Sequence, residues 1–587
     1  MALYRLITEF LWPPSMMYLN CICILILFTN TQSYFVEVKL KKGYVIGTTE
    51  ETITSGRLYY AFYGIPYARR PTGDLRFKDP KPTKKWKKPF DATTAFNGAC
   101  AQSHIVHKYG QQGYEDCLKL NIYTPILPKK ENTRLLPVAV WIHGYAFTSS
   151  LSHIFGGDGF IDSDIIFITI SHRIGVFGFL KVDDNSTDGN MGLKDIVLAL
   201  KWIRKHINGF GGDKNNITVM GSDSGATFLS LLLMTPNKKL FSKMILQSGT
   251  IFSPSMFVRD HKLERERLLR NLRHQGYNDL MSAPTKEILE ASQKIYNHKE
   301  MIDFQRPIVP FSPLPEVVSN KSLLLMPPND FFQNIKKEIK GKHILIGFNS
   351  KESISEIIPF IHNTHYLKYF QPYFKFMVPF SDGCVFNYTT KSYMKIGYKI
   401  KNHYFKNDIT DKSLEEFLRY TTDIKTFPVW KFIKTLLTTT RSRIFVYKFN
   451  YMGRYNAAKA TSLAGATSKI KGASNGDEIC YILRCEPLLE NYIETNKDPN
   501  DRDGIFMKHI TALWANFIIT GNPTPNSQSG HIEWIPMTLK ESNILLLENV
   551  TRLIHTNKED DMFLFWNGLY EEYYANDRCS KNEHEEL

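Results

Sequence analysis

The stretch "NNITVMGSDSGATFLSLLLM", Asn215 to Met234, decides the fold. Its first half, residues 216–221, is an apolar run of strand length, and residues 224–234 have the length and composition of a buried helix. Gly221 and Gly225 frame the few residues between them. The stretch therefore predicts a strand, a sharp turn and a helix in immediate succession.

Asp223 stands at the centre of that turn. In the pattern G-x-S-x-G, a serine midway between two glycines is lifted clear of the backbone by a strained turn and acts as a nucleophile. Here the residue between Gly221 and Gly225 is an aspartate. Ser222 and Ser224 flank it, but neither has a glycine two residues away on both sides. The frame of a catalytic motif is present, and its nucleophile is replaced.

The flanking sequence alternates strand and helix patterns, which is typical of a mainly parallel sheet with helices on both faces. Apolar runs predict strands at 138–144, 164–173, 343–350 and 443–451. Residues 191–209 predict a helix, because Leu193, Ile196, Leu200 and Ile203 fall on one face. The fold class predicted is α/β.

Bulk properties limit the functions to consider. The chain has 587 residues, 43% of them hydrophobic, and a formal net charge of +15. Lysine clusters such as "KLKKG" (39–43) and "KPTKKWKKPF" (81–90) contribute to that charge; an acidic partner or a membrane surface is conceivable, but a solvated surface is the simpler interpretation. The chain contains no phosphate-binding loop, dinucleotide fingerprint, zinc-spaced cluster or nucleic-acid motif. We therefore expect no cofactor, no metal and no nucleic acid.

The N-terminus predicts entry into the secretory pathway. Residues 16–33 combine an apolar stretch too short to cross a bilayer comfortably with small polar residues, as a signal peptide does. We expect a signal peptide at 1–33, one domain at 34–575 and a polar tail at 576–587. No later run reaches transmembrane length.

The tail ends "HEEL" (584–587), which resembles endoplasmic-reticulum retrieval signals but also fits chance in a glutamate-rich tail. The predicted location is extracellular or the lumen of the endoplasmic reticulum, and glycosylation sequons occur at Asn185, Asn216, Asn320, Asn387 and Asn549.

The cysteines fit an oxidising compartment. Cys100 and Cys117 lie close together in a loop-like stretch, and we expect them to form a disulfide. If "CYILRC" (480–485) is a strand, its two cysteines point to opposite faces, which argues against a bond between them. The partners of Cys384 and Cys579 stay open.

Six ordered motifs carry a family resemblance: "FYGIPYARRPTGDLRF", "EDCLKLNIYTP", "PVAVWIHGYAF", "RIGVFGFL", "GNMGLKDIVLALKWIRKHINGFGGD" and "NNITVMGSDSGA". Together they resemble the type-B carboxylesterase and cholinesterase group of α/β-hydrolases, from about residue 35 to about residue 570. The resemblance implies an α/β-hydrolase fold with a deep gorge above the carboxyl ends of the strands. Fold alone does not imply activity.

The resemblance also assigns the catalytic positions. The family elbow reads Gly-Glu-Ser-Ala-Gly, so Asp223 stands at the nucleophile. "GFNSKES" resembles the stretch that holds the triad acid, which makes Glu352 that acid. "GASNGDE" (472–478) resembles the stretch that holds the triad histidine, and Asn475 occupies the histidine position. The nearest histidines in sequence, His403 and His509, are too distant for a small alignment shift to restore one.

The oxyanion hole is altered as well. Where the family has His-Gly-Gly-Gly-Phe, this chain has His143, Gly144, Tyr145, Ala146 and Phe147. Gly144, Tyr145 and Ser224 take the positions whose backbone N–H groups would face the oxyanion. His143 is expected to order this loop, and Ser248 is expected to be structural.

These losses exclude an ordinary serine-esterase mechanism at this site. Acyl transfer needs a hydroxyl nucleophile and an imidazole that shuttles its proton, and an asparagine side chain has no suitable pKa. The sequence predicts a carboxylesterase-type protein without ester hydrolysis that binds a small apolar ligand or a protein partner. Two alternatives stay open: residual hydrolysis from elsewhere in the chain, and attack by Asp223 that stalls as a covalent adduct for want of a histidine. For the ground state we expect Asn475 to contact both Asp223 and Glu352, and the pKa of Glu352 to be raised by Asp223. The oligomeric state is not predicted.

Overall fold

The computed structural model describes residues 35–574 with internal gaps. The gaps cover residues 96–98, 103–112, 129–133, 145–149, 184–188, 255, 259, 297–308, 318, 320, 335–341, 375–377, 380–390, 407, 467–468, 526–531 and 556–557. The predicted signal peptide and the HEEL tail lie outside the described residues.

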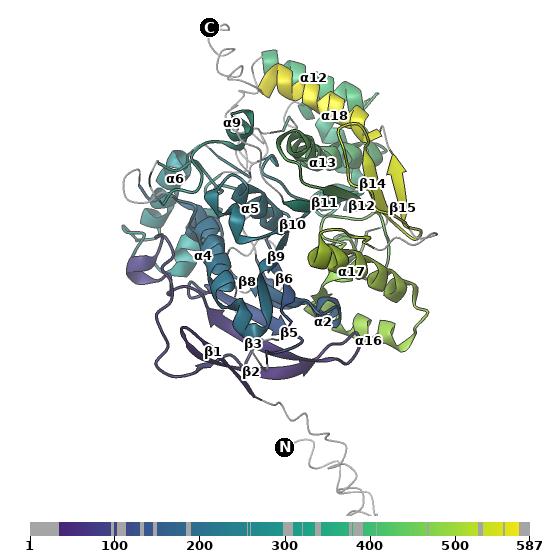
Figure 1. Ribbon diagram of the computed structural model, residues 1–587. Coiled ribbons are helices and arrows are strands. Elements are labelled where there is room, and N and C mark those ends of the chain that lie inside the picture. The colour runs from purple at the N-terminus through teal and green to yellow at the C-terminus, as the bar shows by residue number, and fades with distance from the viewer. Residues whose placement is uncertain are drawn as a thin grey trace, which may run out of the picture.

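A 13-stranded sheet runs through the described chain (Figure 1). Its order is β1-β2-β3-β5-β8-β6-β9-β10-β11-β12-β14-β15, with β4 paired to β2. The middle of the sheet, from β8 to β14, is parallel, and antiparallel strands extend it at both ends. The strand bounds are β1 Val36–Leu40, β2 Gly43–Glu51, β3 Leu58–Pro66, β4 Phe90–Asp91, β5 Lys119–Thr124, β6 Leu136–Ile142, β7 Phe155–Gly156, β8 Ile166–Ile170, β9 Gly212–Ser222, β10 Lys243–Gln247, β11 His343–Asn349, β12 Ile444–Phe449, β13 Arg484–Cys485, β14 Asn543–Leu547 and β15 Arg552–His555.

Helices lie on both faces of this sheet (Figure 1). In that view α4 and α5 pack on one side of the central strands, and α2 and α17 on the other. The helix bounds are α2 Asp158–Asp162, α3 Gly175–Phe179, α4 Met191–His206, α5 Ser224–Leu232, α6 Lys262–His274, α7 Thr285–Gln293, α9 Pro328–Gln333, α10 Ile358–His362, α11 Phe370–Tyr373, α12 Lys391–Tyr404, α13 Leu414–Thr439, α14 Ala457–Ser462, α15 Ile479–Ile482, α16 Leu489–Lys497, α17 Arg502–Thr520 and α18 Lys558–Leu569.

Strand β6 explains why both faces are covered. Its residues alternate between two hydrophobic cores: Val138 and Val140 join the core that contains α4 and α5, whereas Ala139 and Trp141 join the core that contains α17. Successive side chains of a strand point to opposite faces, so a strand that is apolar at every position needs a helix layer on each side. The predicted α/β architecture, with a mainly parallel central sheet between helices, is confirmed.

The expectation for "CYILRC" is wrong. Residues Ile479–Ile482 form the short helix α15, and only Arg484–Cys485 are strand. Because the helix and the turn after it bring the two ends together, the alternation of a strand does not apply. Cys480 and Cys485 form a disulfide, with their Cα atoms 5.4 Å apart. The predicted Cys100–Cys117 disulfide is also present, while Cys384 and Cys579 lie outside the described residues.

None of the helices in the described parts of the chain is long and apolar enough to cross a membrane.

Candidate active site

Asp223 occupies a strained turn between β9 and α5. Its backbone has φ 49° and ψ −118°, a conformation that non-glycine residues rarely adopt. The Asp223 N–H donates to Gln247 O at 2.9 Å, and Thr227 N–H donates to Asp223 O at 2.9 Å. The residue is 8% exposed. Hydrogen bonds on both sides therefore hold the aspartate in the conformation that a nucleophile elbow requires.

Two glycines make this turn possible. A Cβ atom at Gly225 would lie 2.1 Å from Ile142 O, and one at Gly249 would lie 2.1 Å from Asp223 O. Both positions exclude any side chain, because backbone atoms occupy the space. The elbow is thus packed against the ends of β6 and β10, although its central residue is not serine.

Glu352 follows the end of β11 and is 1% exposed. Its Oε1 atom accepts hydrogen bonds from Ser248 Oγ at 2.6 Å and from the Asn349 N–H at 2.6 Å. Its Oε2 atom is buried and has no hydrogen-bond partner among the residues that the structure describes. One oxygen is firmly held, and the other is left without a donor.

The loop that carries Asn475 is tied to the loop that carries Glu352. Lys351 N–H donates to Ala473 O at 2.9 Å, and Asn475 N–H donates to Glu352 O at 3.2 Å. The backbone therefore places Asn475 beside Glu352. The contacts of Glu352 in the described chain include no hydrogen bond from the Asn475 amide, so the expected bridge between carboxylates is not present on the Glu352 side.

The pKa of Glu352 is raised to about 7. Burial is the main cause, and it outweighs the lowering effects of Lys425 and of the two hydrogen bonds. The direction agrees with the prediction, and Glu478 is a carboxylate that adds to the rise. Ser248 and Asn349 link the carboxylates of Glu352 and Glu478 in one buried hydrogen-bond network.

That network contains residues that the motifs did not single out. Asn349 Nδ2 donates to Glu478 Oε2 at 2.7 Å and to Ser248 Oγ at 3.2 Å, and Gln247 Nε2 donates to Glu478 Oε1 at 3.1 Å. Burial raises the pKa of Glu478 as well. Ser248, which was expected to be structural, contacts the carboxylate of Glu352 directly. In the sequence, this network is indicated only by position: each of its residues lies at, or next to, the end of a predicted strand or a motif.

The oxyanion loop is described only in part. Gly144 is buried, and a Cβ atom there would lie 2.4 Å from Ser224 Oγ. Ser224 Oγ is itself buried, with no hydrogen-bond partner in the described chain. His143 is bonded to residues 150 and 151: Ser150 Oγ donates to its carbonyl oxygen, and Leu151 N–H donates to its Nδ1. Tyr145 to Phe147 lie outside the described residues.

No histidine in the described parts of the chain hydrogen bonds to Glu352. His403 stacks on Phe565 with ring centroids 3.7 Å apart, and burial lowers its pKa. His509 lies on α17, across the sheet from α5. Burial lowers its pKa too. Neither histidine substitutes for the one missing at position 475.

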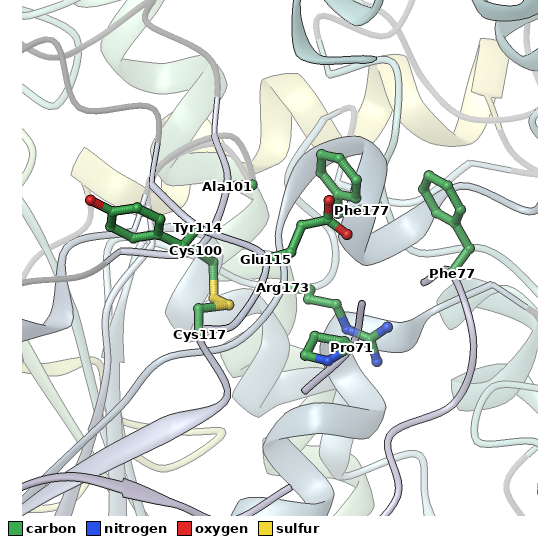
Figure 2. A pocket seen from close by; sticks show the side chains of 9 residues that line it. All are labelled: Pro71, Phe77, Cys100, Ala101, Tyr114, Glu115, Cys117, Arg173 and Phe177. Carbon is green, nitrogen blue, oxygen red and sulfur yellow. A yellow bond between two sulfur atoms is a disulfide. The ribbon is translucent and has the colours of Figure 1, made fainter. Parts of the chain in front are cut away.

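A small pocket lies beside the Cys100–Cys117 disulfide (Figure 2). Its cavity volume is about 10 Å³, room for roughly one water molecule. Its charged lining residues are already paired, Glu115 with Arg76 and Arg173 with Asp195. The pocket is too small and too well satisfied to serve as a substrate site.

The sequons differ in accessibility. Asn549 is exposed. Asn216 lies in β9, where its Nδ2 donates to Ile519 O at 3.2 Å and its Oδ1 accepts from Lys243. Asn185, Asn320 and Asn387 lie outside the described residues.

Comparison with known proteins is consistent with this architecture. A family described as "Carboxylesterase family" matches residues 34–566. The chain is 29% identical to a juvenile hormone esterase of Tribolium castaneum over 83% of this chain and 84% of that protein. It is 34% identical to an acetylcholinesterase of Caenorhabditis briggsae over 52% of this chain and 51% of that protein. A crystal structure of juvenile hormone esterase from Manduca sexta shares its fold, with a TM-score of 0.75, 24% identity, and coverage of 92% of this chain and 100% of that one.

Proposed function

Since the chain belongs to the carboxylesterase family, we propose that it is a noncatalytic member that binds a small apolar ligand in the secretory pathway. Asp223, Glu352 and Asn475 hold the three positions of the family's catalytic triad. The observation that carries the proposal is the state of Glu352: its Oε2 is buried and receives no hydrogen bond from any described residue. In a working triad, that second carboxylate oxygen holds the imidazole in place.

The chemistry of the three positions supports a loss of ester hydrolysis. Asp223 places a carboxyl group where the family has a serine hydroxyl, and its acylation by an ester would give a reactive mixed anhydride in place of the stable acyl-serine ester. Asn475 can donate and accept hydrogen bonds but cannot take up and return a proton near neutral pH. Glu352, with its pKa raised to about 7, has no imidazolium beside it to favour its charged form. Each change alone disables the proton relay.

Attack by Asp223 on an electrophilic carbon is the alternative. In the first step the carboxylate displaces a halide, or opens an epoxide by breaking its C–O bond, and forms an alkyl ester; release of the alcohol from that ester needs a base to activate water. No hydrogen bond joins a histidine to Glu352 in the described chain. This route therefore ends in a covalent ester on Asp223, which a mass measurement detects.

The predicted location has its own support. The two disulfides are of the kind found in proteins that mature in an oxidising compartment. One relative, 29% identical over 80% of this chain, is a venom carboxylesterase of Apis mellifera. We propose that the protein works outside the cell or in the lumen of the endoplasmic reticulum.

Native mass spectrometry tests the binding role. Purified full-length protein is incubated with apolar esters, including juvenile hormone because relatives carry that name, and the bound species are weighed. We expect a noncovalent complex whose ligand is recovered with its ester intact. Recovery of the free acid and alcohol would contradict the proposal, and a mass increase that survives denaturation would support the covalent alternative.

A paired substitution tests the assignment of positions. We expect Asp223→Ser alone to stay inactive on a nitrophenyl ester, because a serine without a base is a poor nucleophile. Asp223→Ser with Asn475→His should gain measurable turnover, as the imidazole then meets Glu352 Oε2. Equal activity in the single and double variants would show that Asn475 is not at the histidine position.

A further inference from the structure

Lysines from three segments far apart in sequence meet at one end of the molecule. The segments are the turn between β1 and β2, the loop 81–89 before β4, and the end of α4 (Figure 1). We call the following residues the basic patch: Lys41, Lys42, Lys85 and Lys205. Further exposed lysines flank it in the same segments: Lys39, Lys84, Lys87, Lys88 and Lys201. The sequence shows separate clusters, whereas the fold makes them one surface.

Backbone contacts fix this convergence. Trp86 N–H donates to Lys42 O at 2.8 Å, and β4 pairs with β2 through Val45 and Phe90. The end of α4 approaches through Gly209, where an added Cβ would lie 3.0 Å from the Leu40 side chain. These contacts involve the sheet edge and the core. The fold itself therefore brings the three segments together, independently of the conformations of the lysine side chains.

The patch is electrostatically crowded. Burial lowers the pKa of Lys42, and the charges of Lys205 and Lys85 lower it further. The pKa of His206 is lowered to about 4, mainly by burial and further by the charges of Lys205, Lys42 and Lys41. Among the described residues, the main influences on these two groups are burial and lysines, not carboxylates. The positive charges at this surface therefore act on one another without compensation.

Ion pairs do not neutralise the patch. None of its four lysines forms a salt bridge to a described residue, whereas Lys194, Lys351 and Lys399 elsewhere in the chain do. The C-terminal dipole of α4 accounts for a cation at Lys205. It does not account for Lys41 and Lys85, which belong to the turn and the loop. The described chain therefore presents these lysines as a positively charged surface to which an anionic partner can bind.

An aromatic ring lies within the same surface. Trp86 is half-buried, packs against Phe90 with ring centroids 5.3 Å apart and the rings tilted by 30°, and is followed by Lys87 and Lys88. An indole ring beside lysines suits a polymer in which anionic groups alternate with the apolar faces of sugar rings.

We propose that the basic patch binds a linear sulfated polysaccharide. Lysine-rich patches recognise such polymers through many ionic contacts that release counterions. Anionic lipids are concentrated in the cytoplasmic leaflet, away from a protein of the secretory pathway. Only the choice of polysaccharide over lipid rests on the proposed location; the patch itself is independent of the state of the catalytic positions.

The test compares two variants of equal net charge. Each replaces four exposed lysines by glutamine, so the net charge of +15 falls by four in both. The patch variant changes Lys41, Lys84, Lys85 and Lys205. The control variant changes Lys239, Lys395, Lys412 and Lys540. Lys42 is kept in both, because its ammonium donates to Thr83 O and holds the loop.

Binding of full-length protein to heparin, desulfated heparin and phosphatidylserine vesicles is measured between 50 and 300 mM salt, after equal melting temperatures have shown that both variants fold. We expect the wild type to bind heparin, the patch variant to bind at least ten-fold more weakly with a shallower salt dependence, and the control variant to match the wild type. Loss of sulfate groups should abolish binding. Equal losses in the two variants, or binding to vesicles but not to heparin, would overturn the proposal.

Discussion

Replacing Glu352 by glutamine should stabilise the protein more as the pH rises. In the folded protein the pKa of Glu352 is about 7, compared with an ordinary value of 4.5. A carboxyl group with a raised folded pKa binds its proton more tightly in the folded state. Its stabilising contribution is therefore complete below about pH 4.5 and is lost as the pH rises through about 7. Glutamine mimics the protonated form at every pH and does not suffer this loss.

The size of the effect follows from the pKa shift. A displacement from 4.5 to about 7 corresponds to about 3 kcal/mol over the full range, of which about 2–3 kcal/mol falls between pH 5 and pH 8.5. At roughly 2 cal/mol/K per residue, a chain of this length has an unfolding entropy near 1 kcal/mol/K, so the melting temperature should shift by about 2 °C. The amide left without a partner at the Oε2 position adds a cost, but that cost is the same at each pH and cancels in the comparison.

Differential scanning fluorimetry at a fixed scan rate measures this shift. The quantity to follow is the melting temperature of Glu352→Gln minus that of the wild type, at pH 5, 7 and 8.5. Glu416→Gln on the exposed face of α13 is the control, and its difference should stay flat. If Glu352 were an ionised partner of a catalytic base, its folded pKa would be depressed and the difference would change in the opposite direction with pH. That outcome would refute the reasoning.

Two further predictions concern the elbow and the surface. Gly225→Ala places a Cβ atom 2.1 Å from Ile142 O and should lower the melting temperature by about 2–3 °C. The control Gly568→Ala in α18, whose added Cβ meets nothing within 4 Å, should leave the melting temperature unchanged or slightly higher. Equal effects of the two substitutions would show that the elbow is not packed tightly. Peptide mapping of protein from a eukaryotic secretory host should find a glycan on Asn549, which is exposed, and none on Asn216, whose amide is engaged within the fold; the reverse pattern would contradict the accessibility argument.

The fold could be predicted because its central strands are strongly patterned apolar runs that alternate with helix patterns. The run from Asn216 to Gly221 is mostly apolar and rich in β-branched residues, and it lies within β9. The same logic failed for residues 480–485, where a run of six residues satisfied the strand pattern but was too short to distinguish a helical turn. Hydrophobic periodicity identifies a helix or strand only over a longer run of residues. Whether two nearby cysteines can form a disulfide depends on the turn between them, which periodicity does not predict.

The site could be predicted only as a set of positions. The motifs identified Asp223, Glu352 and Asn475, and the backbone brings the last two together. They did not identify Glu478 as the second buried carboxylate, because no spacing rule connects the ends of β10 and β11 with the loop after α14. Which donors reach a buried carboxylate is decided by packing across the sheet. The cause of a pKa shift is for that reason harder to read from a sequence than its direction.

The hydrolysis rate of a nitrophenyl ester by the wild type and by Asp223→Ala tests the central claim most directly. The account predicts that both proteins release nitrophenol no faster than buffer containing an inert protein at the same concentration, from pH 6 to pH 9. Wild-type turnover above that background that disappears in Asp223→Ala would contradict it, because Asp223 would then be a working nucleophile without a histidine at position 475.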